Sequence, residues 1–492
     1  MKKQLTILFC LMSLSLAMWA QRGTDYELTP YAAAMKCDDI NGDGLTDVIV
    51  SHYNNNDQSP LLTILMNDGE GRFVPAGTIV CDLEGFPSYF LLEDFDNDGF
   101  PDIAVYLSVP GENGIPGTCL LTLYHNNGEG GFVMGGQTPL TQPDPLWDNP
   151  YYRLMTAGDF NHDGFMDIAV STDYNSNAAA STGFLLNDGA GGMTAPEFLL
   201  GTSLFIGAVG DLDNDGKDDI ADGCRYYVSE TFPPVQKELY ASAWDCLFIH
   251  GMAIVDLNGD GLSDMVEARM VEFCSDDDIE VRFLQNHGAE GFEVVNVVEF
   301  PGTVTPYGDS PNNLRVFNLD GDGFPDYIVQ TGQFRTEFTG YSILKGKDRF
   351  DTEAPVTLPL EDEDEGFRTF EVCDVNGDGL DDLLVLRSDM SFNSWLTVIL
   401  NGDLQDLTRL SEEREIFSLQ PNPATGQVTV IGEGIREVEV RNLLGQQVAQ
   451  TECPEGVDSI IVSLEGLPQG VYIVSVRLAD GKRCEKKLVV QQ

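Results

Sequence analysis

The amino-acid sequence predicts an all-β protein in which a seven-bladed β-propeller is followed by a small β-sandwich. Three observations lead to this fold class. A nine-residue acidic pattern recurs seven times, short apolar runs of strand length flank every copy, and after about residue 405 the acidic pattern ends while alternating strand-like segments continue. Recurrence at a fixed period is typical of repeat architectures, and several short strands per repeat indicate a propeller.

The repeated pattern reads Asp-x-Asp/Asn-x-Asp-Gly-x-x-Asp. Its copies begin at residues 39, 94, 159, 211, 256, 318 and 374, at intervals of 55, 65, 52, 45, 62 and 56 residues. We number the positions of each copy 1 to 9 and call the copies loops one to seven. A unit of about 55 residues that recurs seven times predicts seven equivalent structural units.

Each unit contains the signals of four strands. Apolar runs such as 89–92 and 103–106 surround the acidic loop, and a third run such as 120–124 ends in an Asn-Gly turn that supplies the positive φ of a tight hairpin. An apolar residue after the turn begins the fourth strand. Units four and six depart from this pattern, because unit four lacks the Asn-Asp-Gly turn and unit six has a degraded one. Residues 25–30 are placed to supply the outer strand of the last blade and so close the ring.

The loop chemistry indicates Ca²⁺. Oxygens at positions 1, 3, 5 and 9, with the backbone carbonyl of position 7, surround one point, and Ca²⁺ takes six to eight oxygen ligands in flexible geometry. Gly at position 6 allows the sharp turn. The loops are not EF-hands, because Val50 stands where the first loop would need a bidentate Glu. The alternative is that acidic turns merely solvate hairpins.

The sequence thus predicts up to seven Ca²⁺ sites, with the weakest at loop six, where Asn318 replaces the Asp of position 1. The predicted ligands are Asp39, Asn41, Asp43 and Asp47; Asp94, Asp96, Asp98 and Asp102; Asp159, Asn161, Asp163 and Asp167; Asp211, Asp213, Asp215 and Asp219; Asp256, Asn258, Asp260 and Asp264; Asn318, Asp320, Asp322 and Asp326; and Asp374, Asn376, Asp378 and Asp382.

The repeats resemble the FG-GAP/VCBS family, the seven-bladed propellers of integrin α-subunit heads and of many secreted bacterial proteins. The resemblance covers about residues 25–405. It implies that calcium binds between the first two strands of a blade in a structural role, and that ligands or partners use the face of the propeller.

The two ends of the chain point to export. Residues 1–20 have a basic start, a short apolar core and small residues near Ala17 and Ala20, as in a secretory signal peptide. We therefore expect a propeller over 21–405, a linker over 406–415 and a separate module over 416–492. No Cys-x-x-Cys pair occurs, so a zinc ribbon has no support. Cys453 and Cys484 are able to pair within the last module.

The last module is predicted to be a small Ig-like β-sandwich. Its expected strands include 427–431, 437–441, 459–462 and 471–476, with turns between them. The segment is similar to the type A C-terminal sorting domain of the type IX secretion system, through the residues Phe417–Pro423, Val440–Gly445, Leu467–Tyr472 and Lys486–Val490. This resemblance implies export across the outer membrane of a Gram-negative bacterium, with the secretion machinery as partner, followed by release or surface attachment. An ordinary Ig-like stalk is the alternative.

Charge narrows the possible functions. The chain has 27 Lys and Arg against 80 Asp and Glu, a net charge of −53. This charge excludes the electrostatic footprint of a nucleic-acid-binding protein and argues against docking on anionic lipid. No run of apolar residues after the signal is long enough for a transmembrane segment. No hydrolase, phosphate-binding or dinucleotide motif occurs, so we expect no enzyme and no catalytic residues.

The leading hypothesis is a monomeric, calcium-stabilised surface propeller that binds a glycan, a protein or a matrix component. The segment Trp147–Tyr152 is one candidate contact region, because its aromatic rings can stack on a sugar. Burial of these rings between blades is the alternative. The rival function is a secreted polysaccharide-acting enzyme built on the same propeller.

Overall fold

A computed structural model describes residues 23–53, 60–81, 90–109, 118–140, 152–172, 181–195, 197–200, 208–221, 225–229, 234–239, 249–270, 279–300, 314–333, 336–358, 365–389, 391–405, 408, 417–432, 434–442, 446–452, 459–464, 466–478 and 483–491. The chain divides into two compact units, Met1–Leu404 and Gln405–Gln492. The expected signal peptide lies outside the described residues.

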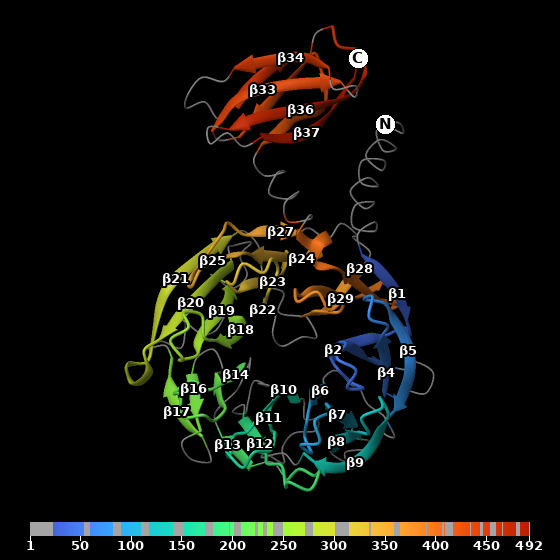
Figure 1. Ribbon diagram of the computed structural model, residues 1–492, viewed down its shortest axis with the longest axis vertical. Helices are drawn as coiled ribbons and strands as arrows, with labels where there is room; N and C mark the ends of the chain where they lie inside the picture. The colour runs from blue at the N-terminus through green and yellow to red at the C-terminus, as the bar shows by residue number, and fades with distance from the viewer. Residues whose placement is uncertain are drawn as a thin grey trace. The chain divides into compact units, whose positions relative to one another are not determined.

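The described part of the first unit contains seven four-stranded antiparallel sheets arranged in a ring (Figure 1). In chain order the first four sheets are β2 (Ala32–Asp38), β3 (Asp47–Tyr53), β4 (Pro60–Asn67), β5 (Phe73–Val80); β6 (Phe90–Glu93), β7 (Asp102–Val109), β8 (Thr118–Asn126), β9 (Phe132–Pro139); β10 (Tyr152–Gly158), β11 (Asp167–Thr172), β12 (Ser181–Leu185), β13 (Glu197–Leu200); and β14 (Ala208–Gly210), β15 (Asp219–Ala221), β16 (Arg225–Val228), β17 (Val235–Glu238).

The remaining three sheets complete the ring. They are β18 (Ile249–Val255), β19 (Asp264–Met270), β20 (Ile279–Asn286), β21 (Phe292–Phe300); β22 (Leu314–Phe317), β23 (Asp326–Gln333), β24 (Thr336–Leu344), β27 (Val356–Leu358); and β28 (Glu365–Cys373), β29 (Asp382–Asp389), β30 (Ser394–Ile399), β1 (Thr24–Leu28). A small β25 (Gly346–Asp348) and β26 (Asp351–Thr352) ribbon lies between β24 and β27, and a 3-10 turn, Gly288–Glu290, joins β20 to β21. We call the seven sheets blades one to seven.

The first strands of the blades contact one another in cyclic order. The contacting pairs are β2 with β6, β6 with β10, β10 with β14, β14 with β18, β18 with β22, β22 with β28 and β28 with β2. This cycle closes after seven members and is the geometry of a β-propeller. The number of four-stranded sheets agrees with the number of acidic loops that the sequence contains.

The ring is closed by the segment that the sequence predicted for this role. Strand β1 pairs antiparallel with β30, from Thr24 opposite Val398 to Leu28 opposite Ser394. The last blade therefore combines one N-terminal strand with three C-terminal strands. Leu28 also lies in a hydrophobic cluster whose other members come from blades one and seven, so that apolar packing and backbone pairing seal the same junction.

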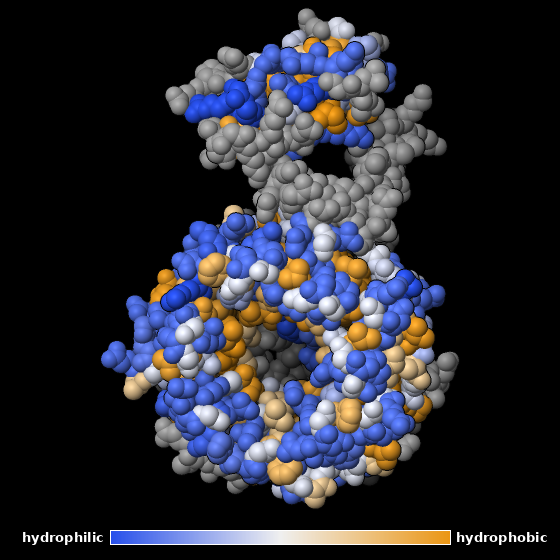
Figure 2. Space-filling view, viewed as in Figure 1, coloured by the Kyte–Doolittle hydropathy of each residue, from blue (hydrophilic) through white to orange (hydrophobic). Residues whose placement is uncertain are grey.

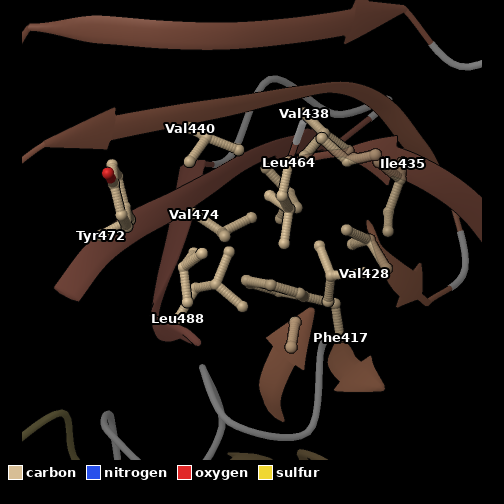
Figure 3. Close-up of a cluster of buried hydrophobic side chains, with 14 residues drawn as sticks. Phe417, Val428, Ile435, Val438, Val440, Leu464, Tyr472, Val474 and Leu488 are labelled. Atoms are coloured by element: carbon tan, nitrogen blue, oxygen red, sulfur yellow. The ribbon is translucent and has the colours of Figure 1, made fainter. Parts of the chain in front are cut away.

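The second unit is built around a single hydrophobic core. Its strands are β31 (Ser418–Thr425), β32 (Gln427–Ile431), β33 (Ile435–Asn442), β34 (Gln447–Glu452), β35 (Ser459–Ser463), β36 (Gly470–Leu478) and β37 (Arg483–Val490), paired in the order β34-β33-β36-β37-β31-β32-β35. Strand β31 pairs with β32 over Ser418–Gln420 and again at Thr425, and with β37 at Ala424. It thus joins two groups of strands, and both groups contribute side chains such as Val428 and Val474 to the core (Figure 3).

Several residues that mark the sorting-domain pattern hold this unit together. The side chain of Asn422 donates to the carbonyl of Lys487 (2.8 Å) and accepts from the amide of Val489 (2.9 Å), which pins β31 to β37. The Tyr472 hydroxyl donates to the carbonyl of Pro468 (2.8 Å). These motif residues therefore have a structural role within the unit. The possible Cys453–Cys484 pair is not tested, because Cys453 and the side chain of Cys484 lie outside the described residues.

Candidate functional site

The seven acidic loops connect the first strand of each blade to its second strand. Position 9 is the first residue of the second strand in every blade, as in Asp47 at the start of β3 and Asp382 at the start of β29. We call the seven loops together the acidic belt. All 28 predicted ligand residues lie within it, and the structure describes all of them.

Burial changes along each loop in the same way. The carboxylate of position 5 is exposed in all seven loops, whereas that of position 9 is completely buried. Position 2, which the sequence pattern left open, is a buried apolar residue in every copy: Ile40, Phe95, Phe160, Leu212, Leu257, Leu319 and Val375. Each loop is thus fixed to the core at positions 2 and 9 and presents its middle to solvent.

The buried Asp of position 9 organises the backbone around it. In blade seven, one oxygen of Asp382 accepts from the amide of Val375 (3.0 Å) and the other from the amide of Asn401 (2.6 Å). The position 9 carboxylate accepts the same two bonds in all seven blades. One comes from the backbone amide of position 2, and the other from the backbone amide of a residue at the end of the third strand or just after it. Position 9 therefore has a structural function that does not require a metal.

Positions 1 and 5 fold the loop around themselves. Asp39 at position 1 accepts from the amides of Gly42, Asp43 and Gly44 at 2.8–3.1 Å, and Asp43 at position 5 accepts from the amide of Leu45 (2.9 Å). The amide of position 6 donates to the side chain of position 1 in every loop except loop six. In loop six, among the amides of positions 4 to 6, only that of Gly321 donates to Asn318 (2.9 Å). Loop six is thus less firmly held.

The backbone conformation explains which residues occur at position 4, which the sequence pattern also left open. Positions 4 and 6 have positive φ in all seven loops, and position 4 is Gly, Asn or His throughout: Gly42, Asn97, His162, Asn214, Gly259, Gly321 and Gly377. Gly and Asn adopt this conformation at least cost. His162 is the exposed position 4 of loop three.

The donor set of the loops fits a hard cation. In loop two, oxygens of Asp94, Asp96 and Asp98 lie within 4.8 Å of one another, and in loop four those of Asp211, Asp213 and Asp219 do so. The Oδ1 atom of Asp213 is buried and has no hydrogen-bond partner. A buried carboxylate oxygen without a donor is costly, and a bound cation would supply the missing interaction.

The raised pKa of the position 9 carboxyls also favours a bound cation. Burial raises the pKa of all seven position 9 carboxyls, and carboxylates of the same loop raise it further; it reaches about 7 at Asp167 and about 6 at Asp47, Asp219, Asp326 and Asp382. The amide hydrogen bonds lower the pKa but do not cancel this effect. A divalent cation in the loop favours the charged form and removes the mutual repulsion.

In two loops a basic side chain lies beside the carboxylates. Lys217, at position 7 of loop four, forms an ion pair with Asp215 (3.0 Å). His125 places Nδ1 at 3.3 Å from Asp96 and 3.2 Å from Asp102, and its Nε2 lies 3.0 Å from the carbonyl oxygen of Gly191. Burial lowers the pKa of His125, but the bonds to Asp102 and Gly191 outweigh it and the pKa is raised. Sequence analysis missed His125, because it is 23 residues from Asp102 along the chain.

Neighbouring blades are joined at the belt by a recurring Asn. The side chain of Asn126, at the end of β8, donates to the carbonyl of Ile40 in loop one (2.8 Å) and to that of Pro101 in its own loop (3.1 Å). Equivalent bonds to the preceding blade come from Asn67, Asn187, Asn286 and Asn401. The sequence analysis treated these residues only as turn formers, although they are also the bridges between blades.

The two irregular units lack this bridge. Ser229 takes the place of Asn in blade four and keeps only the bond to its own loop, at the carbonyl of Asp218. Gly346 takes the place in blade six, where a Cβ atom would lie 2.4 Å from the carbonyl oxygen of Pro325. The departures that the sequence showed in units four and six therefore correspond to a real loss of inter-blade bonds.

The candidate aromatic contact region is not placed. Residues 147–151 lie outside the described residues, and of Tyr152 only the backbone is described, as the first residue of β10.

Figure 2 shows mainly hydrophilic residues on the visible face of the ring, with apolar residues scattered among them. No helix in the described part of the chain has the length and apolar character that a membrane span requires.

Comparison with known families agrees with the repeats and with the terminal module. Residues 39–105 match the model of an FG-GAP-like repeat, residues 152–186 match the FG-GAP repeat, and residues 418–491 match the secretion system C-terminal sorting domain. The chain is thus a secreted or cell-surface protein in which a propeller with FG-GAP repeats precedes a type IX sorting domain. The sorting domain implies an interaction with the secretion machinery.

Similarity to whole proteins is distant. No curated protein matches the sequence. Among solved structures, the chain resembles the Vibrio cholerae biofilm matrix protein Bap1 (11% identity, TM-score 0.34, covering 95% of this chain and 90% of that one) and the Dos1 propeller (8%, 0.41, 75% and 78%). It also resembles the Photorhabdus luminescens Tc holotoxin pore (13%, 0.33, 96%), of whose chain it spans only 19%. At these values the similarity carries no argument about function.

Proposed function

We propose that this protein is a calcium-stabilised binding module, exported through a type IX secretion system to the surface of a Gram-negative bacterium or beyond it. The observation that carries the calcium part is the repeated donor set of the acidic belt, above all the buried Asp213 oxygen that has no hydrogen-bond donor. Positions 1, 3, 5 and 9 of each loop would hold the ion, which would neutralise charge and tie the two strands of the hairpin together.

Oxygen donors and local flexibility favour Ca²⁺ over other divalent cations. The sets contain only carboxylate and amide oxygens, which Ca²⁺ and Mg²⁺ share, but the exposed middle of each loop imposes no tight octahedron. Loop two departs from the set through His125, and loop four through the ion pair of Lys217. We therefore place the strongest calcium dependence in loops one, three, five and seven, and the weakest in loop six.

The calcium test is thermal unfolding of the full chain. We expect a chelator of divalent cations to lower the midpoint and an excess of Ca²⁺ to restore it, because an ion that binds only the folded state adds about 2.7 kcal/mol per site at a concentration of 100 Kd. Mg²⁺ at equal concentration should restore less. An unchanged midpoint at millimolar Ca²⁺ would contradict calcium binding.

A structural role suits the belt better than catalysis does. Paired carboxylates are the groups that a glycosidase would use, yet the buried position 9 carboxylates accept two backbone amides each, and those of position 1 are similarly engaged. The oxygens of these carboxylates are thus already occupied by hydrogen bonds from the backbone. The belt is therefore proposed as a scaffold, and the face of the propeller as the place where a glycan, protein or matrix ligand binds.

Binding and catalysis are distinguished by two measurements on the same calcium-loaded protein. A glycan array together with a pull-down from matrix extracts should detect a retained ligand, while release of reducing ends from polysaccharides should stay at the level of the buffer. Turnover that is abolished by a single substitution outside the belt would favour the enzyme instead. Size-exclusion chromatography with light scattering tests the proposed monomer.

A further inference from the structure

The junction between the first and the last blade contains two cysteines. Cys37 lies in β2, the innermost strand of blade one, and Cys373 lies in β28, the innermost strand of blade seven. These two strands contact each other. Both cysteines pack against the same hydrophobic cluster, which contains residues of blades one and seven, and the Cys37 thiol is a hydrogen-bond partner of Cys373.

Each of these residues is a thiol in this structure. Cys81 is also a thiol, but it is buried in a different cluster, which is formed by blades one and two. Two half-buried thiols in hydrogen-bond contact, on adjacent strands that are far apart in sequence, place their sulfur atoms next to each other, as formation of a disulfide requires.

We propose that Cys37 and Cys373 form a disulfide in the exported protein, and that this bond covalently closes the propeller ring. The C-terminal sorting domain indicates secretion, and disulfides persist in the oxidising surroundings outside the cytoplasm. In the reaction the two thiols lose two protons and two electrons as one S–S bond forms. The electrons pass to the disulfide of a thiol-oxidising oxidoreductase, which becomes a dithiol.

The location makes this bond mechanically useful. The ring is otherwise closed by the pairing of β1 with β30 and by contacts such as the ion pair between Arg387 and Asp25 (2.7 Å), all of which are non-covalent. A bond between Cys37 and Cys373 would link two residues whose only other covalent connection is the chain that runs around the whole ring. The loop that it closes is long, and a cross-link over a long loop restricts the unfolded chain most.

The bond would also set the spacing of two acidic loops. Cys37 stands two residues before Asp39, the first residue of loop one, and Cys373 immediately precedes Asp374, the first residue of loop seven. These loops already touch, because the Thr46 hydroxyl donates to the carbonyl of Asp374 (2.9 Å). The disulfide is therefore expected to hold the belt together at the one place where the ring has chain ends.

Peptide mapping tests whether the bond forms. The full-length protein is collected after export, unfolded without reductant in the presence of an alkylating agent, and digested with trypsin. Cleavage at Lys36 and Arg72 and at Arg368 and Arg387 gives peptides 37–72 and 369–387, and each contains a single cysteine. We expect the two peptides to be linked and to separate on reduction. Recovery of both as alkylated, unlinked peptides would overturn the proposal.

Thermal unfolding at constant Ca²⁺ tests whether the bond stabilises the ring. A reductant should lower the midpoint of the wild-type protein by about 5 °C, and the double variant Cys37→Ala/Cys373→Ala should not respond to this extent. The matched control Cys81→Ala should keep the response. A wild-type midpoint that changes no more than that of the double variant would overturn the role in closure. Should the double variant fail to fold, the peptide map still decides whether the bond exists.

Discussion

Aspartates of one short motif have different physical roles, and burial separates them. Position 5 is exposed and accepts only from groups of its own loop, whereas position 9 is buried and holds two backbone amides from different segments. The sequence pattern treats both as calcium ligands. The structure adds that position 9 also holds the backbone of two segments, so the two positions should respond differently to substitution.

Replacing position 9 or position 5 of loop seven by Ala separates these roles. Asp382→Ala leaves the buried amides of Val375 and Asn401 without acceptors and should lower the free energy of unfolding by about 3 kcal/mol or more, even with a chelator present. Asp378→Ala should cost less than about 1 kcal/mol with the chelator and should reduce the stabilisation by Ca²⁺. Chemical denaturation with and without Ca²⁺ measures both, and equal losses in the chelator would contradict this division.

Glu371 shows how a buried acid can be stabilised without a metal. It lies on β28 and forms ion pairs with Arg315 of β22 (3.0 Å) and Lys36 of β2 (2.7 Å), so that it joins the inner strands of three blades. Burial raises its pKa, but the charges of Arg315 and Lys36 outweigh burial and lower the pKa to about 2. Sequence analysis missed the network, because its three members are distant along the chain.

The pH dependence of Glu371 follows from this lowered pKa. The charged pair contributes its full stability above the ordinary pKa of the acid, about 4.5, and loses it as the pH falls toward 2. Glu371→Gln should cost about 3 kcal/mol at pH 7, because two basic groups lose their partner. The difference between wild type and variant should shrink as the pH falls below 4.5, as followed by denaturation at each pH. A difference that is constant between pH 7 and pH 3 would argue against the network.

At the scale of secondary-structure elements, five of the seven blades are bonded to the preceding blade through an Asn at the end of the third strand or just after it. Asn126 donates to a carbonyl in loop one and to another in its own loop, and its Oδ1 accepts from the amide of Gly128 (3.0 Å). The hairpin turn, the acidic loop and the adjacent blade are therefore one hydrogen-bonded unit. Loss of one bridge should weaken two blades together.

Substitution at the turn of blade two tests this bridge. Asn126→Ala leaves the buried carbonyls of Ile40 and Pro101 without these donors, so it should lower the free energy of unfolding by about 2–3 kcal/mol. The matched control Asn127→Ala removes an exposed side chain that bonds only amides of the turn and should cost about 1 kcal/mol or less. Similar losses for the two variants would show that the Asn serves the turn alone.

At the scale of the whole molecule, most of the negative charge belongs to the propeller. The segment after residue 415 has seven Lys and Arg against nine Asp and Glu, so it is nearly neutral, while the chain as a whole carries a net charge of −53. Self-repulsion of such a charge opposes a compact state. Calcium in the belt would offset part of this repulsion and would make stability depend on the calcium concentration outside the cell.

The terminal unit should determine where the protein goes. Its residues 418–491 match a sorting domain and form a separate compact unit with a core of its own. Deleting residues 416–492 should therefore trap the protein in the periplasm while the propeller retains its Ca²⁺-dependent unfolding. Cell fractionation with an antibody against the propeller measures the outcome. Normal display of the truncated protein on the surface would reject sorting by this unit.

The sequence was sufficient for features that depend on local pattern. Seven acidic loops at regular intervals predicted seven blades, the alternating runs predicted the strands of the second unit, and residues 25–30 were correctly expected to close the ring, where β1 covers Thr24–Leu28. Strand periodicity and turn chemistry are properties of short segments, so one sequence contains them. The identity of the loop ligands stays a prediction for the calcium experiment to decide.

Only the tertiary structure decided which distant residues meet. The bridge from Asn126 to loop one, the contact of His125 with loop two, the ion pairs of Glu371 and the meeting of Cys37 with Cys373 all join segments that the ring brings together. A single sequence contains no signal for such pairs, because their partners depend on how many blades intervene and on which strand faces which. Local chemistry determined the blades of this protein, and closure of the ring determined what holds them to one another.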